Sequence, residues 1–124
     1  MKKIVLDTNF IFSFFDYDDN NNEKALRIFA GLDDKTEFIV PEVVVAELLI
    51  KESKFDFLMI TKHFSRTYYR NNDKDLDFIS NLDQRIKKPL KAVDCLILAL
   101  CKRHNVRLLT FDKKLEKSYR KLFD

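Results

Sequence analysis

The sequence is poor in the residues that interrupt secondary structure. Gly31 is its one glycine, and Pro41 and Pro89 are its only prolines. This scarcity argues against a glycine-rich loop of the kind that binds phosphate groups, because such a loop needs several glycines close together. It favours instead a chain rich in helices with few tight turns.

Cysteine is also scarce, and long apolar runs are absent. Cys95 and Cys101 are six residues apart on different faces of one expected helix, so we expect neither a C-x-x-C pair nor a disulfide. This usage is typical of a reducing compartment. No run of about 18 apolar residues predicts a membrane-spanning helix, and Asp7 interrupts the first apolar run too early for a signal peptide. We therefore expect a cytoplasmic protein without a membrane segment.

The chain has 124 residues, a length that suits one domain over residues 1–124. Its net charge is +3, but the charge is unevenly spread. Residues 1–60 carry 7 basic and 12 acidic side chains, whereas residues 61–124 carry 16 basic and 8 acidic ones. This asymmetry indicates a polyanion-binding surface close to a cluster of carboxylates. Solvated helix faces explain it equally well.

Short apolar runs alternate with helical patterns along the chain. The expected strands are residues 3–7, 37–40 and 106–110; the expected helices are 10–17, 23–30, 42–52, 73–85, 89–104 and a short one after Asp112 with a further turn from Ser118. Residues 57–61 suit either a strand or a helix, and residues 62–70 favour a helix. The alternation predicts an α/β fold with a parallel sheet covered by helices on both faces.

Punctuating residues set the expected helix boundaries. Asn22 and Asp73 are expected N-caps, and Pro41 and Pro89 are expected at helix starts. Gly31 stands where the helix before it should end.

Two acidic residues stand inside apolar runs. Asp94 lies in the run from Leu90 to Leu100, and Glu47 lies in the helix that begins near Glu42. A carboxylate is seldom buried unless it is paired or binds a metal. A structural acid with satisfied hydrogen bonds is the alternative for each of them.

Two further acids follow strands. Asp7 ends the first strand, and Asp112 follows the last one by two residues. Sites in open parallel sheets form beyond the carboxyl ends of the strands, so these two acids, Glu47 and Asp94 can meet there. Four carboxylates repel one another unless a hard divalent cation such as Mg²⁺ or Mn²⁺ binds them. Helix capping is an equally good interpretation of Asp7 and Asp112. Thr8 and Thr110 are either plain turn residues or hydroxyl donors to these carboxylates.

Four segments that contain these acids resemble the motifs of the PIN domain family. They are L-D-T-N at 6–9, P-E-V-V-V-A-E-L at 41–48, A-V-D-C-L-I-L-A-L at 92–100 and L-L-T-F-D at 108–112. Their order and spacing match small single-domain members over nearly the whole chain. The resemblance implies a three-layer fold with a central, mostly parallel, twisted sheet of four or five short strands and helices on both faces.

The resemblance also implies a metal-dependent ribonuclease. Asp7, Glu47, Asp94 and Asp112 would be the catalytic ligands of Mg²⁺ or Mn²⁺, and water would cleave an RNA phosphodiester to leave 5′-phosphate ends. The expected supporting residues are Thr8, Asn9 and Thr110. Many small members resemble VapC toxins, which form homodimers and are blocked by a cognate antitoxin, so we expect these partners here.

Three alternatives remain open at this stage. The first is a PIN nuclease of RNA maturation or decay that has no antitoxin. The second is a PIN-like module that binds RNA without cutting it. A phosphatase of the haloacid dehalogenase type also begins with a strand that ends in Asp, but its acid/base position is occupied here by Asn9.

Two groups of side chains are candidates for binding surfaces. Lysines that precede Asp94 suggest an RNA-facing patch, although a solvated helix entrance explains them equally well; they are Lys87, Lys88 and Lys91. A run of phenylalanines exceeds one helix face, so we expect some of them at a dimer or antitoxin surface and the rest in the core; they are Phe10, Phe12, Phe14 and Phe15.

Overall fold

The computed structural model describes residues 2–51 and 68–123. Its sheet has the strand order β3-β2-β1-β4, and every pair of neighbouring strands is parallel. The strands are β1 (Lys3–Leu6), β2 (Glu37–Pro41), β3 (Tyr68–Tyr69) and β4 (Arg107–Leu109). The predicted parallel α/β fold is confirmed. Three strands form the body of the sheet, and β3 adds only two residues. The expected number of four or five strands is therefore slightly too high.

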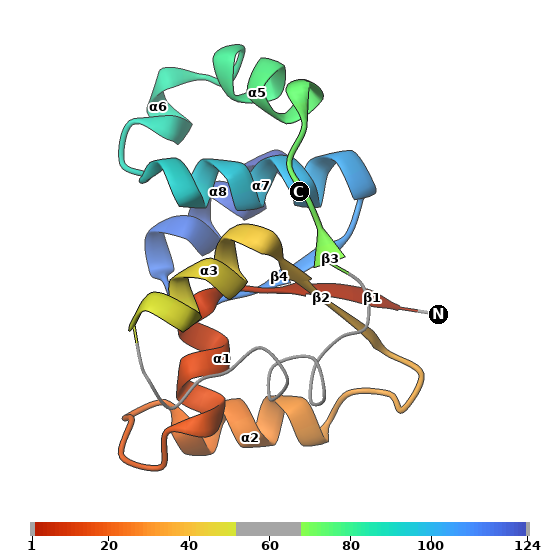
Figure 1. The fold of residues 1–124 in the computed structure, drawn as a ribbon, viewed down its shortest axis with the longest axis vertical. Coiled ribbons are helices and arrows are strands. Elements are labelled where there is room, and N and C mark those ends of the chain that lie inside the picture. The colour runs from red at the N-terminus through yellow and green to blue at the C-terminus, as the bar shows by residue number, and fades with distance from the viewer. Residues whose placement is uncertain (1, 52–67, 124) are drawn as a thin grey trace.

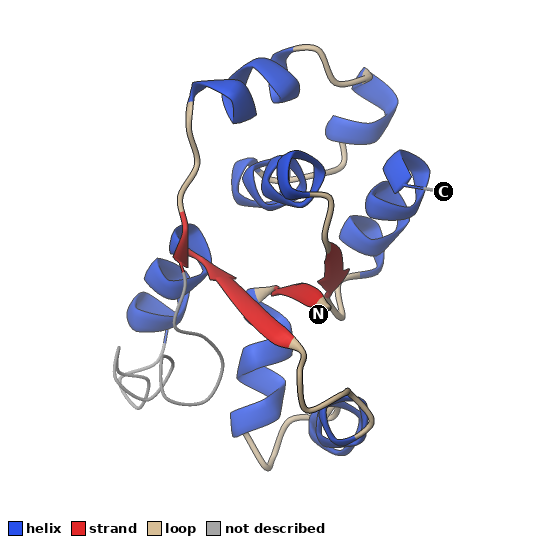
Figure 2. Cartoon of the chain, turned by 90° about the vertical axis from the view of Figure 1, so that its right-hand side faces the viewer, coloured by secondary structure: helices blue, strands red, loops and turns tan. Residues whose placement is uncertain are grey.

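Helices cover both faces of this sheet (Figure 1). The helices α1 and α2 lie on one side, α7 and α8 lie on the other, and α5 and α6 form an outer layer over α7 (Figures 1 and 2). The helices are α1 (Thr8–Phe15), α2 (Asn22–Ala30), α3 (Glu42–Lys51), α5 (Asp73–Ser80), α6 (Gln84–Lys87), α7 (Ala92–His104) and α8 (Lys113–Phe123). No described helix is long and apolar enough to cross a membrane.

The sheet supplies the centre of the hydrophobic core. Ile4, Val5 and Leu6 of β1 are almost completely buried, as expected for a central strand between two helical layers. Ile97 and Leu98 of α7 pack in the same core cluster. This packing fixes the position of α7 relative to the end of β1.

Several expected boundaries at the start of helices were wrong. Asn22 lies inside α2, where its amide donates hydrogen bonds to the carbonyls of Ser13 (2.8 Å) and Phe14 (3.3 Å) near the end of α1. Pro41 is the last residue of β2, a position at which a missing N–H does not interrupt the ladder. Pro89 precedes α7, which begins only at Ala92.

The expected helix over residues 73–85 is two helices. Asn72 is the N-cap of α5, so the expected cap at Asp73 was wrong by one residue. Helix α5 ends at Ser80, where the Asn81 side chain bonds back to the Asp77 carbonyl at 2.9 Å. Asp83 then caps α6.

Other segments differ more simply from the sequence-based expectations. The chain after Ser118 continues as part of α8 rather than forming a separate turn. The helix expected over residues 62–70 is wrong for residues 68–70, which are β3 and a residue outside any helix. The expectations for residues 52–67 lie outside the described residues.

A buried ion pair joins α5 to α7 and was missed in the sequence. Asp75 is only 1% exposed and accepts hydrogen bonds from Nε (2.8 Å) and Nη2 (3.0 Å) of Arg103. The Asn71 amide and the Asn72 backbone N–H each add a bond of 3.0 Å. Burial alone raises the pKa of Asp75, but the bonds from Arg103, Asn72 and Asn71 outweigh it and hold the pKa below its usual value. The outer helical layer is therefore anchored by a charged carboxylate.

Candidate functional site

Asp7 stands at the end of β1 and is the most buried of the candidate acids. Its side chain is held from two directions: Oδ1 accepts the Thr8 backbone N–H at 2.8 Å, and Oδ2 accepts the Thr110 hydroxyl at 2.7 Å. Its own backbone N–H donates to the Leu109 carbonyl at 3.0 Å. The pairing of β1 with β4 therefore brings Asp7 and Thr110, which are far apart in the sequence, into direct contact.

Burial raises the pKa of Asp7 to about 6. The hydrogen bonds from Thr110 and Thr8 act in the opposite direction, but the negative charges of Asp94 and Glu47 add to the increase. The negative charges of Asp94 and Glu47 therefore act on Asp7. The three acids come from the residue that follows β1, from α3 and from α7.

Glu47 and Asp94 reach this cluster from the early turns of their helices. Glu47 Oε1 accepts the Thr8 hydroxyl at 2.5 Å, which links α3 to the start of α1. Asp94 Oδ2 accepts the Lys91 backbone N–H at 3.3 Å across the first turn of α7. Burial raises the pKa of Asp94, and the charges of Asp112 and Glu47 raise it further. Asp112 is thus the fourth member of the electrostatic cluster.

Asp112 also caps α8. Its Oδ1 accepts the backbone N–H groups of Lys114 (2.9 Å) and Leu115 (3.1 Å). The capping interpretation is therefore correct for Asp112, and in part for Asp7, which caps α1 through Thr8. Capping leaves each carboxylate at the carboxyl ends of the strands, so the two roles are compatible.

Thr110 and Asn9 organise the turn between β4 and α8. The Thr110 hydroxyl donates to Asp7, lies 3.3 Å from Asn9 Oδ1, and accepts the Asp112 backbone N–H at 3.0 Å. Asn9 Oδ1 also accepts the Phe111 backbone N–H at 2.9 Å. The supporting contacts expected of Thr8, Asn9 and Thr110 are therefore present. Asn9 carries an amide, which does not titrate, so it offers no acid/base group for a phosphatase.

The cluster suits a hard cation in its chemistry but is not a preformed metal site. Within residues 2–51 and 68–123, no three His, Cys, Asp or Glu side chains are grouped so that they could hold a metal ion as they stand. Glu47 is turned toward Thr8, and Asp112 is turned toward the N-terminus of α8. All four acids offer carboxylate oxygens, the ligands that Mg²⁺ and Mn²⁺ prefer. A cation would also offset the negative charges of Asp94 and Glu47, which add to the increase that burial causes in the pKa of Asp7.

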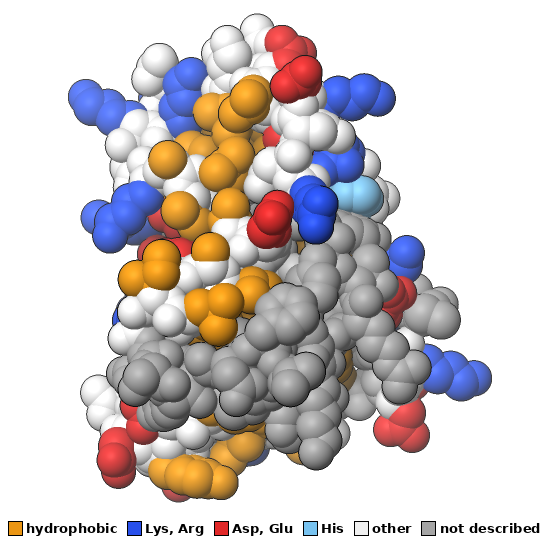
Figure 3. All heavy atoms as spheres, viewed as in Figure 1, with side chains coloured by type: hydrophobic (Ala, Val, Ile, Leu, Met, Phe, Trp, Pro, Cys, Tyr) orange, Lys and Arg blue, Asp and Glu red, His pale blue; other side chains and the backbone are white. Residues whose placement is uncertain are grey.

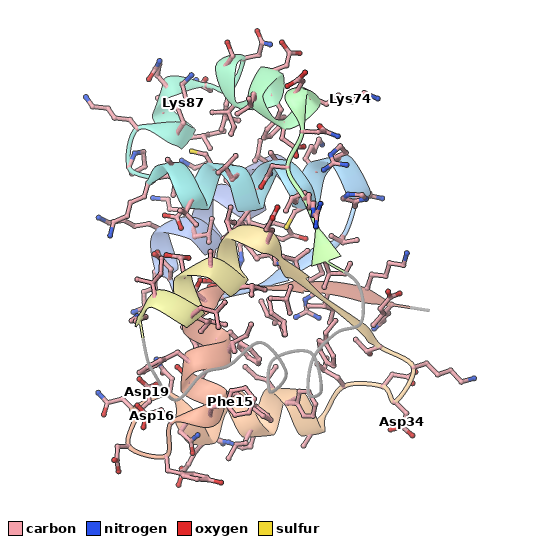
Figure 4. All side chains as sticks on the ribbon, viewed as in Figure 1. Phe15, Asp16, Asp19, Asp34, Lys74 and Lys87 are labelled. Carbon is pink, nitrogen blue, oxygen red and sulfur yellow. The ribbon has the colours of Figure 1, made fainter. Side chains whose placement is uncertain are left out.

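The candidate lysines do not form one uniform patch. Lys87 Nζ donates to the carbonyls of Ile79 (3.1 Å) and Ser80 (3.4 Å), so it caps the end of α5 in the outer layer (Figure 4). Lys88 and Lys91 are exposed. An RNA-facing role for these lysines stays a prediction.

The phenylalanine run divides between the core and its border. Phe10 is 1% exposed and stacks on Phe111 with ring centroids 5.4 Å apart, so the core interpretation is correct for Phe10. Phe12, Phe14 and Phe15 are half-buried and pack against the core. A role for some of them at a dimer or antitoxin surface stays a prediction.

The metal-free protein is expected to lose stability as the pH rises from about 4 to 7. Folded Asp7 has a pKa of about 6, against 3.8 for an exposed Asp side chain as in the unfolded chain, so in this range the folded state binds more protons than the unfolded state. The free energy of unfolding should fall by about 2 to 3 kcal/mol over this interval. Urea unfolding in EDTA measures this slope. Asp7→Asn should remove most of it, and an unchanged slope in that variant would contradict the assignment.

A family model described as PIN domain matches residues 4–121. The chain belongs to the PIN domain family. Its fold is similar to that of VapC20 from Mycobacterium tuberculosis, described as a sarcin-ricin loop cleaving toxin, with a TM-score of 0.69, 16% identity, and coverage of 93% of this chain and 94% of that one. No curated protein sequence matches the chain.

Two solved complexes have components with the same PIN fold. FitAcB from Neisseria gonorrhoeae gives a TM-score of 0.72 at 17% identity, with 94% of this chain and 93% of that chain covered. VapBC2 from Rickettsia felis, solved with a DNA fragment from its promoter, gives 0.66 at 16% identity, with 93% and 92% covered. The PIN fold inferred from the four motifs is therefore confirmed.

Proposed function

We propose that this PIN-domain protein is a divalent-metal-dependent endoribonuclease and the toxin of a type II toxin–antitoxin pair. The observation that carries this proposal is the carboxylate cluster at the end of β1, in which Asp94 and Glu47 oppose the charge of buried Asp7. A cluster of this kind, built only from oxygen donors, favours binding of Mg²⁺ or Mn²⁺.

Each residue has a distinct part in the proposed site. A bound divalent ion supplies charge neutralisation at a phosphoryl oxygen and lowers the pKa of water. Asp7, Glu47, Asp94 and Asp112 would hold that ion. Thr110 keeps Asp7 in place, and Thr8 keeps Glu47 in place, through hydroxyl hydrogen bonds. Asn9 holds the turn that carries Asp112.

The antitoxin part of the proposal rests on the related folds. VapC20 is described as a toxin, and VapBC2 was solved bound to a DNA fragment from its promoter. A neighbouring gene for a small DNA-binding protein would support the assignment as a toxin. Absence of such a gene would favour a PIN nuclease of RNA maturation or decay.

Cleavage of RNA is expected with Mn²⁺ or Mg²⁺ and should stop in EDTA. Asp94→Asn should reduce the rate about a hundredfold or more, because it removes one carboxylate from the ion's ligands. Asp34→Asn makes the same chemical change in the exposed loop before β2 and should leave the rate unchanged (Figure 4). Gel-based cleavage assays on total RNA measure both.

Two outcomes would remove parts of this proposal. If folded Asp94→Asn cuts as fast as the parent protein, the site is elsewhere. If the parent binds RNA but cuts none with either ion, the protein is a PIN-like RNA-binding module that does not cut.

We also expect a homodimer that uses the outer surface of α3. Ile50 is 86% exposed on α3, and Leu49 beside it is 43% exposed. Figure 3 shows hydrophobic side chains gathered over this helix. Exposed apolar groups of this size are typical of interaction surfaces. Ile50→Ser should lower the sedimentation coefficient from dimer to monomer, whereas Leu76→Ser on α5 should not. A parent protein that sediments as a monomer at micromolar concentration would contradict this expectation.

A further inference from the structure

The outer edge of β4 is an open strand edge. Strand β4 is last in the order β3-β2-β1-β4, and no described strand pairs with its outer side. The Leu109 carbonyl accepts the Asp7 N–H, so the main chain of Leu109 faces β1. Because the main-chain groups of a strand alternate in direction, the N–H and C=O of Leu108 point to the outer edge. An edge of this kind is a template for pairing with another strand.

A groove runs along this edge. Its volume is about 380 Å³, and it is lined by β4 together with Thr110 and Phe111, which follow this strand. One wall comes from Lys24 and Ile28 of α2, and the other comes from α8. Figure 2 shows the sheet lying between these two helices, and among the described residues no strand lies beyond β4. The groove therefore presents a strand edge at its floor with a helix on each side.

The walls of the groove are positively charged. Four basic side chains line it against one acidic side chain; they are Lys24, Arg107, Lys113 and Arg120 against Glu116. Glu116 is already paired with Arg120 at 2.8 Å. Lys24 lies 5.8 Å from the centre of the Phe111 ring, so that its charge sits over the end of the groove. An occupant of this groove is expected to be negatively charged.

We propose that this groove binds an acidic peptide segment of a partner protein, which pairs with β4 as an additional strand. The main-chain groups of Leu108 supply the pairing, and the basic walls select for acidic side chains. Ile28, Phe111 and Tyr119 give the groove an apolar part that suits the alternating side chains of a strand. The proposal concerns binding alone, so it holds whether or not the protein cleaves RNA.

Two other occupants fit these observations less well. A second copy of the chain that paired edge to edge through β4 would bring the same basic residues toward each other, and like charges oppose such contacts. RNA would satisfy the positive charge, but it has no repeating main-chain amides to pair with the strand edge. The peptide is favoured because it uses both features.

The test is an NMR titration of the full-length ¹⁵N-labelled protein with a defined probe. The probe is an eight-residue peptide of alternating valine and glutamate, compared with the same peptide carrying lysine in place of glutamate. The acidic peptide should shift the amide signals of Leu108 and Thr110 and slow the hydrogen exchange of the Leu108 N–H. The lysine peptide should leave these signals unchanged.

A charge-matched pair of variants separates the groove from general electrostatic attraction. Arg107→Glu/Lys113→Glu should weaken binding of the acidic peptide roughly tenfold or more, because both residues line the groove. Lys35→Glu/Lys74→Glu carries the same change in net charge on exposed side chains that do not line the groove. This variant should bind as the parent does; Lys74 is labelled in Figure 4.

Three results would overturn the proposal. The first is equal weakening in both variants, and the second is a signal shift that spares β4. The third is a shift of the β4 amide signals by a twelve-nucleotide single-stranded RNA while the acidic peptide has no effect. That result would assign the groove to RNA. Correct folding of each variant is checked from its ¹⁵N spectrum, and Arg107→Gln replaces Arg107→Glu if the double variant unfolds.

Discussion

Asp7→Asn is expected to reduce RNA cleavage at least about a thousandfold and, at the same time, to stabilise the metal-free protein at pH 7 by about 2 kcal/mol. Activity falls because the variant lacks the most buried carboxylate of the proposed ion site. Stability rises because burial and the charges of Asp94 and Glu47 disfavour an ionised Asp7 in the folded state. Opposite changes in function and stability are typical of residues kept for a site rather than for the fold.

The local geometry accommodates this substitution. An asparagine at position 7 can accept the Thr8 N–H through its amide oxygen and donate to the Thr110 hydroxyl oxygen through its nitrogen. The Thr110 hydroxyl proton can then turn to Asn9 Oδ1, which lies 3.3 Å away. The variant is therefore expected to keep the turn between β4 and α8.

Three measurements check this prediction. Cleavage assays with Mn²⁺ give the activity, urea unfolding in EDTA gives the stability, and the shift in melting temperature on addition of Mn²⁺ gives ion binding. The parent protein should be stabilised by Mn²⁺, whereas Asp7→Asn should respond weakly. A variant that is less stable than the parent at pH 7 would show that Asp7 is mainly a structural cap.

Asp75→Ala is expected to destabilise the protein by about 3 to 5 kcal/mol. The substitution leaves Arg103 without the carboxylate that binds both Nε and Nη2, and it removes the acceptor for Asn71 and Asn72. Removing one partner of a buried ion pair is costly, because the remaining charge still bears its desolvation penalty without the attraction that offset it. The Asp75 contribution should also disappear as the pH falls below about 4, because its pKa lies below the usual value in the folded state.

Urea unfolding of matched variants isolates this effect. Glu116→Ala breaks the exposed pair with Arg120 and should cost less than about 0.5 kcal/mol. Asp75→Asn should cost less than Asp75→Ala, because an amide oxygen still accepts some of the same bonds. If Asp75→Ala costs no more than Glu116→Ala, the buried pair does not anchor the outer layer. Since Asp75 lies on α5, the cleavage rate of the folded fraction should stay close to that of the parent protein.

The sequence determined the parts of this protein that depend on local patterns. The apolar run from Lys3 to Leu6 forms the central strand, and Asp7 follows it at the carboxyl end. Asn105 ends α7 in the left-handed conformation (φ 51°), which asparagine tolerates better than most residues. Parallel strands place their carboxyl ends at one edge, so the acids that follow them were expected to gather there.

Only the tertiary structure decided which side chains satisfy one another. Asp75 and Arg103 are 28 residues apart, and Thr8 and Glu47 are 39 apart, so no local pattern predicts either contact. Asn22 was expected to cap its own helix but instead bonds to carbonyls of α1, because the packing of α1 on α2 brings them within reach. A local pattern sets the conformation of a segment, whereas a hydrogen bond between distant residues exists only once packing has brought both elements together.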